Sequence, residues 1–576
     1  MYIICIATDY DGTLAENGAV APSTLDGLVR FKQSGRKLVM VTGRELPHLE
    51  RVFSRLDLFD RVVAENGALL YNPATKKEQP LASEPPEAFV KRLKDAGVAP
   101  LSVGRSIVAT WEPYEKIVLD AIQDLGLELQ IIFNKGAVMV LPAGINKASG
   151  LKAALDDLGL SFHNVVAVGD AENDHAFMQA SGFAVAVANA LPAVKETADL
   201  VTSGARGAGV EELIDAVVES DVAAFAKVGE HGAVEIGVGP DRRPIAIHPY
   251  GGGALIAGLS GSGKSTLATA LIERCIAAAF QVCVFDPEGD YTQLRGAIML
   301  GDSKSPPHLQ EVLKALQRPS DSVVVNMAAI SPEDRPTAFS RFVAALTELR
   351  ARTGRPHWLI LDEAHNLLPA ERNASATALP PTLPATVFVT VDPNALHQDA
   401  LERVDDVFAI GEKAAGTVAS FCKALKITAP RPPALAPGEG QALLWRRCAG
   451  EKPILMSTNP PDEKAERHTR KYVEGELDED KSFFFRGPAN ALNLRAQNLT
   501  LFLQIADGVD DETWSHHLDA HDYSRWIREA IKDEELAEEV RQAEKDEAGP
   551  RETRRRVRKA IERRYIAPVA AQNAAG

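Results

Sequence analysis

Short apolar runs alternate with amphipathic helical patterns in the first part of this chain. Valine-rich runs such as KLVMVTGR, RVVAENGALLY and NVVAVGD each end in a polar or glycine-bearing turn. A buried parallel sheet with functional side chains at its strand ends produces this pattern. We therefore predict an α/β domain over residues 1–225.

Inside this domain, residues 72–142 follow a different pattern. AFVKRLKDAG and YEKIVLDAIQDLG have a helical period, whereas SIVATWE and LQIIFNKGAVMVLP are strand-like. We expect a small α+β insert here, which leaves residues 1–71 and 143–225 as the core of the domain.

A second α/β pattern covers residues 228–460. Its apolar runs include ALIAGLSGSGKST, QVCVFDPEGDY, HWLILDEAHNLLP and ATVFVTVDP. QALLWRR and PILMST follow a proline-rich stretch, and we expect them to be the final strands of this domain.

The composition changes again near residue 461, and we expect residues 461–576 to form a mainly helical accessory domain. His516, His517 and His521 could suggest a metal site, but no cysteine or strand-end acid completes a ligand set. We favour a helix surface around Trp514 and Trp526. An acidic helix (533–547) precedes a basic one (551–564), and we favour their pairing with each other or with solvent over a nucleic-acid arm.

Length, charge and cysteine content narrow the class of protein. A chain of 576 residues is too long for one core. The net charge of −16 gives no electrostatic case for nucleic acid as the main partner, although it does not exclude a local basic groove. The five cysteines have no metal-ligand spacing, which is typical of a reduced, cytoplasmic setting. We expect no membrane span, and MYIICIATDYDGT is predicted to form a first strand rather than a signal peptide.

Four polar motifs follow apolar runs of the first domain. They contain Asp9 and Asp11, then Thr42 and Gly43, then Lys147, and finally Asp170, Asn173 and Asp174. Because the carboxyl ends of parallel strands meet at one edge of a sheet, we expect these side chains to surround one crevice. The carboxylates suit a hard cation such as Mg²⁺, and the lysine supplies a mobile positive charge.

These motifs and ENGALLY (65–71) resemble the haloacid dehalogenase (HAD) superfamily, in its Cof-like type IIB branch, across residues 1–225. The resemblance implies a Rossmann-like core with a cap, and a Mg²⁺-dependent phosphatase. Asp9 would then attack phosphorus and become an aspartyl-phosphate, and Asp11 would act as general acid and base. The remaining residues would divide between phosphoryl binding (Thr42, Gly43, Lys147, Asn173) and Mg²⁺ binding (Asp9, the backbone carbonyl of Asp11, Asp170, Asp174).

The insert stands where this branch carries its cap, the main determinant of leaving-group choice. It is short, and it is similar to the small cap of archaeal-type phosphoglycolate phosphatases and of sugar-phosphate phosphatases. The resemblance therefore implies a small organic phosphate as the substrate, without indicating which one.

A phosphate-binding loop opens the second domain. Residues 258–265 fit G-x-x-x-x-G-K-[ST] between an apolar run and a helical pattern. We expect the glycines to expose backbone N–H groups to ATP, the lysine to reach its β- and γ-phosphates, and the serine to bind Mg²⁺. The loop residues concerned are Gly258, Gly261, Gly263, Lys264, Ser265 and Thr266. Asp362 and Glu363 end a later strand, where we expect Asp362 to hold the Mg²⁺ water shell and Glu363 to polarise the attacking water.

This domain resembles HerA/FtsK-like P-loop ATPases in IGVGPDRRPIAIHP, VFDPEGDY and LILDEAHNLLP. The resemblance implies a RecA-like fold, ATP hydrolysis and a homo-oligomeric ring. The sensor strand departs from the family pattern, because residues 390–393 are TVDP and carry no basic residue, which leaves translocation open. Arg403 and Arg431 are candidates for the arginine that completes a neighbour's site. His365 is expected to be a packing residue.

Three functions from different classes stay open. The favoured one is a small-molecule phosphatase joined to an ATPase that regulates or assembles it. The second is a nucleic-acid processing protein, a DNA end phosphatase with DNA-stimulated ATPase; the cap, the Asp362-Glu363 pair and the acidic charge count against it. The third is a nucleotide-sensing scaffold. The expected partners are a small phosphorylated metabolite, ATP and further copies of the chain, without a membrane.

Overall fold

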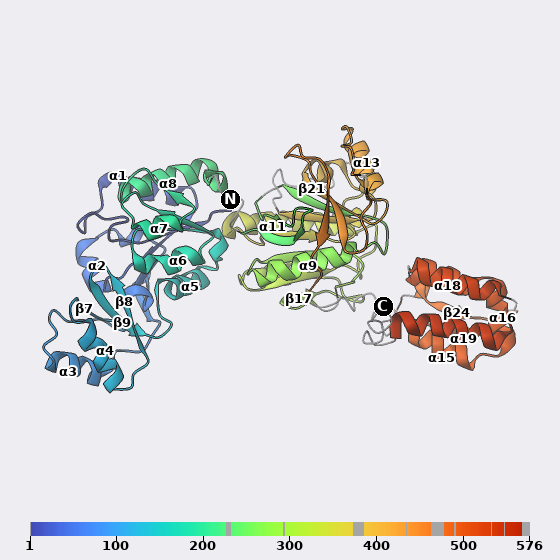
Figure 1. Cartoon of the computed structure of the whole chain (residues 1–576), viewed down its shortest axis with the longest axis horizontal. Coiled ribbons are helices and arrows are strands. Elements are labelled where there is room, and N and C mark those ends of the chain that lie inside the picture. Colours follow the sequence, from blue (N-terminus) through green and yellow to red (C-terminus); the bar gives the residue numbers. More distant parts are fainter. Residues whose placement is uncertain are drawn as a thin grey trace.

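The fold consists of two sheet-containing domains followed by a helical one, in chain order (Figure 1). The computed structural model describes residues 2–225, 232–250, 252–291, 294–371, 385–433, 435–461, 477, 479–488, 491–531, 533–546 and 548–566. In these ranges no helix is both long and apolar enough to cross a bilayer.

The first domain is built on an eight-stranded sheet of order β12-β11-β10-β1-β2-β3-β4-β5. Strands β12 to β3 are parallel, and β4 and β5 add an antiparallel edge. The strands are β1 (Cys5–Thr8), β2 (Lys37–Val41), β3 (Arg61–Ala64), β4 (Leu69–Asn72), β5 (Lys77–Pro80), β10 (Val165–Gly169), β11 (Phe183–Ala186) and β12 (Leu200–Val201). Their buried valines and isoleucines form one core cluster, as the apolar runs predict.

Helices cover both faces of this sheet (Figure 1). Helices α1 and α8 pack against each other on one face, whereas α5 and α6 pack together on the other. The helices are α1 (Pro22–Gln33), α2 (Leu46–Val52), α5 (Lys147–Leu158), α6 (His175–Ala180), α7 (Pro192–Glu196) and α8 (Gly207–Ser220). This confirms the predicted α/β core.

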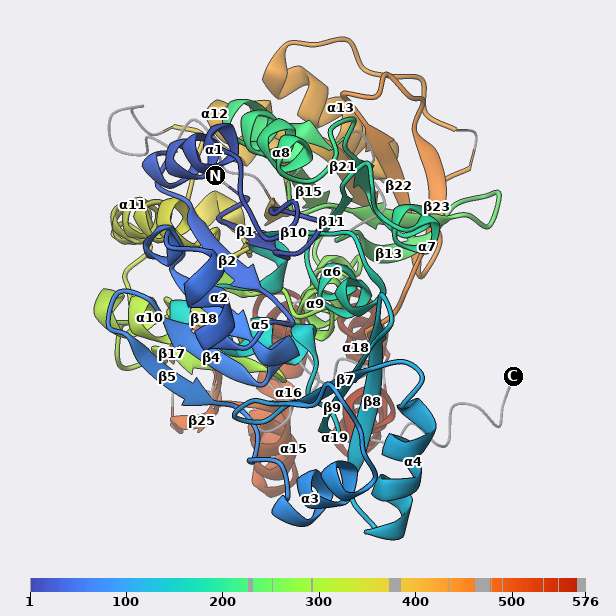
Figure 2. The same ribbon diagram turned by 90° about the vertical axis from the view of Figure 1, so that its left-hand side faces the viewer.

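The insert folds as a four-stranded antiparallel sheet of order β6-β7-β9-β8, with two helices on one face. Its elements are α3 (Glu87–Asp95), β6 (Ser102–Val103), β7 (Val108–Trp111), α4 (Glu115–Asp124), β8 (Leu129–Asn134) and β9 (Ala137–Pro142). Figure 2 shows this cap below the core sheet. The insert begins later than residue 72, because β5 pairs with β4 and so belongs to the core sheet.

The second domain contains an eleven-stranded sheet of order β14-β13-β23-β22-β21-β15-β20-β19-β16-β18-β17. The strands from β21 to β17 are parallel, and the β14 side is antiparallel. The strands are β13 (Val234–Val238), β14 (Pro244–Ile247), β15 (Gly253–Ala257), β16 (Val282–Asp286), β17 (Ala297–Leu300), β18 (Ser322–Asn326), β19 (Trp358–Leu361), β20 (Thr386–Thr390), β21 (Val404–Ile410), β22 (Gln441–Arg446) and β23 (Ile454–Thr458). The helices are α9 (Lys264–Ala277), α10 (Leu309–Leu316), α11 (Arg335–Thr353), α12 (Gln398–Glu402) and α13 (Ala414–Leu425).

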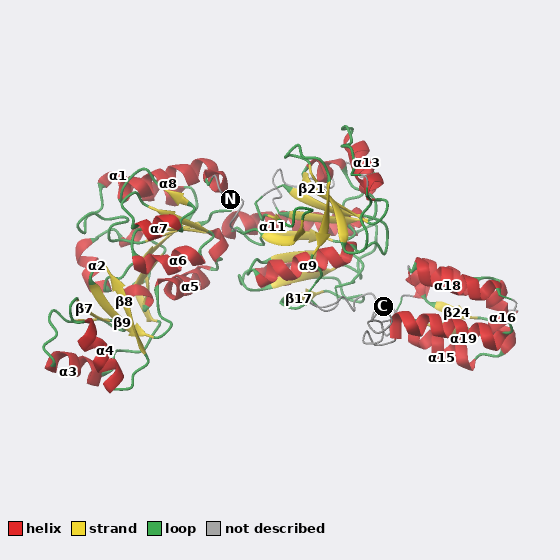
Figure 3. Cartoon of the chain, in the orientation of Figure 1, coloured by secondary structure: helices red, strands yellow, loops and turns green. Residues whose placement is uncertain are grey.

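The C-terminal domain is mainly helical, with one short hairpin (Figure 3). Its elements are β24 (Phe483–Phe485), β25 (Leu494–Ala496), α15 (Leu499–Gly508), α16 (Asp511–Asp519), α17 (Asp522–Trp526), α18 (Glu534–Lys545) and α19 (Pro550–Ile561). Trp514 and Trp526 are buried in its core, so the expectation that they form a helix surface is wrong. The aromatic rings instead pack against Phe502 and Tyr523.

The acidic and basic helices of this domain pair with each other. Arg563 and Arg564 lie 2.6 Å from Glu539 and Asp533, respectively. His517 is held from both sides, since it accepts a hydrogen bond from the backbone of Arg486 (3.0 Å) and contacts Asp522 (2.7 Å). Among the described residues, the three histidines of this domain do not form a metal-binding group.

A polar contact joins the first two domains. The Oδ1 atom of Asn164 lies 3.1 Å from Nε2 of His357, and the guanidinium of Arg355 donates to the backbone carbonyl of Gly159 at 2.6 Å. The ring of His163 stacks on Phe280 with 3.8 Å between centroids. The backbone N–H of residue 281 donates to Nδ1 of His357, which therefore carries its proton on Nε2 and donates to Asn164. Burial keeps the pKa of His357 well below its usual value, so this histidine is neutral.

A buried carboxylate docks the cap on the core. Glu65 lies at the end of β3, and its oxygens accept hydrogen bonds from the backbone N–H groups of Arg105 (2.9 Å) and Ser106 (2.9 Å). Ile107 donates to the same carboxylate at 3.3 Å. One side chain thus satisfies three consecutive amides of the cap.

Replacing Glu65 by Gln should loosen the cap. The amide has one acceptor oxygen and turns its NH₂ toward backbone donors, which leaves buried N–H groups unsatisfied at a cost of about 1–3 kcal/mol. Hydrogen exchange of amides 105–107 should accelerate. Glu78→Gln is the matched control, because Glu78 makes only a more exposed pair with Arg105. Equal exchange in both variants would contradict this role of Glu65.

Candidate functional site

Asp9 and Asp11 leave the core sheet directly after β1, at its carboxyl edge. Asp9 is buried, whereas the side chain of Asp11 is partly exposed. Gly12 follows with φ = +91°, and a Cβ atom there would lie 2.5 Å from Oδ2 of Asp170. Only glycine fits this position without strain, because L side chains disfavour positive φ and the neighbouring carboxylate leaves no space. The turn can therefore approach the opposite strand end closely.

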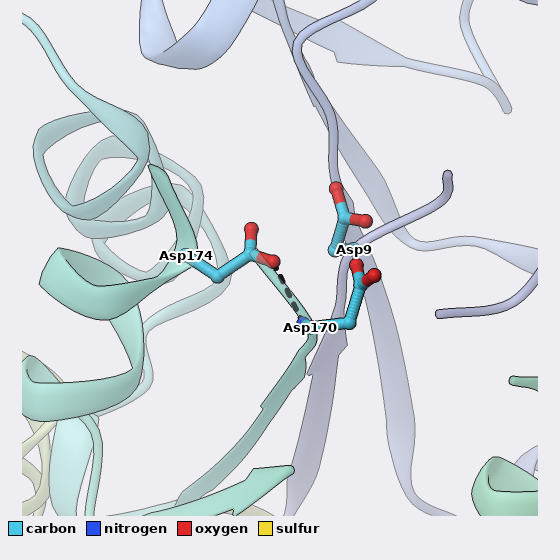
Figure 4. Close-up of side chains that lie close together, drawn as sticks. All are labelled: Asp9, Asp170 and Asp174. Atoms are coloured by element: carbon cyan, nitrogen blue, oxygen red, sulfur yellow. Dashed lines mark hydrogen bonds between the residues drawn. The ribbon is translucent and has the colours of Figure 1, made fainter. Parts of the chain in front are cut away.

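Asp170 and Asp174 approach Asp9 from the end of β10 (Figure 4). Ligand oxygens of the three carboxylates lie within 4.8 Å of one another, and all three residues are buried. The Oδ2 atom of Asp174 accepts hydrogen bonds from the backbone N–H groups of Asp170 and Ala171, both at 2.9 Å. These contacts fix the orientation of the carboxylate before any ligand binds.

The three-carboxylate group fits Mg²⁺. Its donors are hard oxygens, which Mg²⁺ prefers, and their spacing allows one cation to contact all three residues. Asp9, Asp170 and Asp174 would hold the ion, and the backbone carbonyl of Asp11 faces the same space, because the ammonium that contacts Asp170 also lies 3.4 Å from this carbonyl.

Lys147 neutralises part of this negative charge. Its ammonium donates to Oδ1 of Asp9 at 2.6 Å and to Oδ1 of Asp174 at 2.5 Å, and the residue is 1% exposed. Burial raises the pKa of Asp9 to about 7, and repulsion from Asp174 adds to this shift against the attraction of Lys147. Burial lowers the pKa of Lys147, but the two carboxylates outweigh it, so the lysine keeps its charge.

Lys147 reaches the carboxylates because it is the first residue of α5. Asn146 caps this helix by accepting from the backbone N–H groups of Ala148 (2.9 Å) and Ser149 (3.0 Å). A cation at a helix N-terminus is unfavourable for the helix dipole, so the position of Lys147 is explained by its acidic partners rather than by helix formation.

The β2 end supplies a second cation and a hydroxyl. Arg44 forms a bidentate pair with Asp11, with Nε–Oδ2 2.5 Å and Nη2–Oδ1 2.6 Å. Thr42 is buried, and its hydroxyl accepts from the backbone N–H of Arg44 at 3.2 Å. Gly43 faces Asn173, whose amide would lie 3.8 Å from a Cβ atom at Gly43. Contacts thus connect the end of β2 with residues that follow β1 and β10.

Sequence reasoning missed three residues here: Arg44, Thr13 and Lys135. Thr13 donates to Oδ1 of Asp170 at 3.1 Å. Lys135 belongs to the cap, and its ammonium donates to Oδ2 of Asp170 at 2.8 Å. The Lys-Gly pair within LQIIFNKGAVMVLP was a signal, because a glycine between two strand-like runs indicates a hairpin turn.

In the second domain, the loop of residues 258–263 connects β15 with α9. Gly261 and Gly263 have φ values of +77° and +101°, which a phosphate-binding loop requires of glycine. Gly258 packs closely against the carbonyl of Ile410. Lys264 is buried at the start of α9 and donates to the carbonyl of Leu259 at 3.1 Å. Ser265 and Thr266 follow on the same helix turn.

Asp362 and Glu363 follow β19, with β20 between this strand and β15. Burial raises the pKa of Asp362 well above its usual value, and repulsion from Asp286 adds to the shift. Glu363 has φ = +37°, a strained backbone conformation typical of functional sites. A carboxylate oxygen of Glu363 lies 3.5 Å from Nδ1 of His365, and the hydroxyl of Thr390 lies 3.2 Å from the same nitrogen. His365 thus lies between the acid and the sensor strand.

The two candidate arginines come from the later part of this domain. Arg403 precedes β21, at the end of the sheet opposite the loop, and donates to the carbonyl of Asp399 at 3.0 Å. Arg431 is exposed in the segment between α13 and β22.

The fold and the candidate sites define the class of each α/β domain. The first is a capped α/β domain with clustered carboxylates, and the second is a P-loop domain. Residues 6–110 and 110–214 match the family of haloacid dehalogenase-like hydrolases, and residues 254–368 match the central domain of the helicase HerA. Through its first domain the chain belongs to the haloacid dehalogenase-like hydrolases.

Two curated relatives are covered almost completely by a segment of this chain that is about as long as the first domain. A phosphoglycolate phosphatase of Methanothermobacter thermautotrophicus is 31% identical over 221 residues, which are 36% of this chain and 96% of the relative. Phosphoglycolate phosphatase 2 of Saccharolobus solfataricus is 30% identical, and the alignment covers 38% of this chain and 94% of the relative. The solved structure of a haloacid dehalogenase-like hydrolase from Bacteroides thetaiotaomicron aligns with a TM-score of 0.33 and 20% identity. The alignment covers 37% of this chain and 98% of that one.

Lys147→Met should destabilise the first domain in the presence of EDTA. The change leaves Asp9 and Asp174 buried without their cation, and breaking a buried pair in this way costs about 3–5 kcal/mol. Lys152→Met on the same helix is the control, since Lys152 pairs with Asp156 in solvent. Hydrogen exchange of peptides from residues 2–225 measures the difference. Equal stability of the two variants would show that Lys147 does not balance the carboxylates.

Proposed function

We propose that the first domain is a Mg²⁺-dependent phosphomonoesterase that acts through an aspartyl-phosphate on Asp9. The observation that carries this proposal is the position of Asp9 between the ammonium of Lys147 and the carboxylates of Asp170 and Asp174. A nucleophilic carboxylate needs a cationic environment for the phosphate dianion that it attacks.

The residues divide the reaction into two displacements. A carboxylate oxygen of Asp9 attacks phosphorus, and the ester oxygen leaves with a proton from Asp11. Water then attacks the same phosphorus, gives its proton to Asp11, and releases phosphate and free Asp9. Arg44 orients Asp11 through its bidentate pair. Bound Mg²⁺ supplies positive charge to the phosphoryl oxygens.

Thr42, Gly43 and Asn173 bind the phosphoryl group in this proposal. They follow β2 and β10 in the chain. The cap stands over the leaving group, and Met139 from β9 contacts Gly43, since its sulfur would lie 3.6 Å from a Cβ atom there. A docked cap of this size favours a small leaving group, such as a short acid or a sugar. The names of the two phosphoglycolate phosphatases support the short acid.

The second domain is proposed to bind and hydrolyse ATP and to regulate or assemble the phosphatase. Lys264 contacts the phosphates, Ser265 and Asp362 hold Mg²⁺, and Glu363 activates the water, with His365 as its link to Thr390. The TVDP strand carries no basic residue of its own, so an arginine from a second copy, with Arg403 and Arg431 as candidates, would complete the site.

Asp9→Asn should abolish hydrolysis of p-nitrophenyl phosphate in Mg²⁺, because a neutral amide is a poor nucleophile at phosphorus. We expect kcat to fall by at least about a thousand-fold. ATP binding should persist, and Lys264→Ala should keep the phosphatase activity. If the Asp9→Asn variant retained a tenth of the wild-type kcat, the assignment of the nucleophile would be wrong.

Two substitutions in the second domain should separate ATP binding from ATP hydrolysis. Lys264→Ala should remove ATP binding, because the lysine meets charge already present on the nucleotide. Glu363→Gln should keep binding but slow turnover by about a hundred-fold or more, because the carboxylate acts on the attacking water. Equilibrium binding of a fluorescent ATP analogue and phosphate release measure the two steps. Normal turnover of the Glu363→Gln variant would exclude β19 as the catalytic strand.

A further inference from the structure

We infer that Lys135 is a specificity-determining residue that binds a carboxylate on the leaving group, so that the preferred substrates are phosphate monoesters of short carboxylic acids. The inference rests on the proposed phosphatase function and assigns a role to a side chain of the cap.

The position of Lys135 is set by a tight turn. Strands β8 and β9 form a hairpin that pairs without a break from Leu129 to Pro142, and only Lys135 and Gly136 connect them. Their φ values are +49° and +84°, which fits a two-residue turn of type I′. Positive φ is unfavourable for lysine, so a smaller residue such as asparagine or glycine would suit the turn better. The strain is explained if the side chain has a task at this position.

The hairpin tip reaches the catalytic carboxylates. The ammonium of Lys135 lies 2.8 Å from Oδ2 of Asp170 and 3.4 Å from the backbone carbonyl of Asp11. It also lies close to Gly12, where a Cβ atom would be 2.9 Å away. The side chain remains 47% exposed, so it enters the crevice from the solvent side rather than from the core.

Lys135 approaches the side of the crevice that receives the leaving group. The phosphoryl-binding residues belong to the core, where Lys147 contacts Asp9 and Asp174. Asp11, the proposed proton donor to the leaving group, is paired with Arg44. The contact with Asp170 demonstrates that the tip delivers its ammonium to a carboxylate at this depth. Mg²⁺ on Asp170 would compete for the same oxygen, and a leaving-group carboxylate would then be the next partner for Lys135.

The contacts of the ammonium limit the length of this leaving group. Lys135 lies 3.4 Å from the backbone carbonyl of Asp11, the proposed proton donor to the ester oxygen. The carboxylate must therefore lie within a few bonds of the ester oxygen to reach the ammonium. An acid with one or two carbons between its carboxylate and the ester oxygen meets this requirement.

The test compares two substrates, 2-phosphoglycolate and ethyl phosphate, whose leaving groups share a two-carbon skeleton and differ in the carboxylate. In the Lys135→Met variant, kcat/KM for 2-phosphoglycolate should fall about ten- to a hundred-fold, the size expected for a lost charge-assisted hydrogen bond, mainly through KM. The value for ethyl phosphate should change less than about three-fold. Lys135→Arg should restore part of the preference, and Lys91→Met, an exposed lysine of the same cap, should behave as the wild type.

A binding measurement tests the role of Lys135 independently of the proposed phosphatase activity. With Asp9→Asn as background and Mg²⁺ present, calorimetry should give about ten-fold weaker binding of 2-phosphoglycolate when Lys135 is Met, and equal binding of ethyl phosphate. Equal losses for both ligands, or none for either, would overturn the role of Lys135. If the protein with Asp9 intact bound both ligands with this preference but hydrolysed neither, the result would support the role of Lys135 and refute the proposed phosphatase activity.

Discussion

Concentrating carboxylates at one sheet edge requires cations, and this charge balance governs the first domain. Asp9, Asp170 and Asp174 are buried within a few ångströms, and each is paired with a lysine from another part of the chain. Lys147 comes from a helix after the cap and Lys135 from the cap itself. In the absence of a bound cation, these two lysines balance the charge of acids that repel one another.

The two α/β domains meet at the amino ends of β10 and β19, whereas the candidate site residues follow the carboxyl ends of these strands. Asn164 and His357 stand just before β10 and β19, whereas Asp170 and Asp362 follow the same strands. A five-residue strand spans roughly 17 Å, so each site lies about that far from the shared contact. The contact between the domains therefore leaves both candidate sites accessible, and one strand, β10 or β19, connects each site to this contact. A buried neutral histidine suits this joint, because it offers a donor and an acceptor without the cost of a buried charge.

Local sequence was sufficient to find the candidate residues that directly follow a strand. The DYDGT turn, TGR, the acids after β10 and the P-loop all lie immediately after apolar runs, and parallel pairing brings such ends to one edge. The cap boundary was missed by several residues because β4 and β5 form an antiparallel hairpin with mixed polarity, and this hairpin is stabilised by pairing with β3 rather than by its own pattern. The C-terminal tryptophans were misplaced for a related reason: helical spacing does not tell which face is covered.

The sequence by itself determined the two α/β domains, their order and the candidate site residues, because those depend on short-range periodicity and on motifs within a few residues. Tertiary structure alone decided which cations meet which acids. Arg44 and Asp11 are 33 residues apart, and Lys135 and Asp170 are 35 apart. Pairs at such separations arise from the docking of a cap on a core, and no local pattern encodes how two surfaces meet. The position of Lys135 over the crevice is therefore a property of the fold.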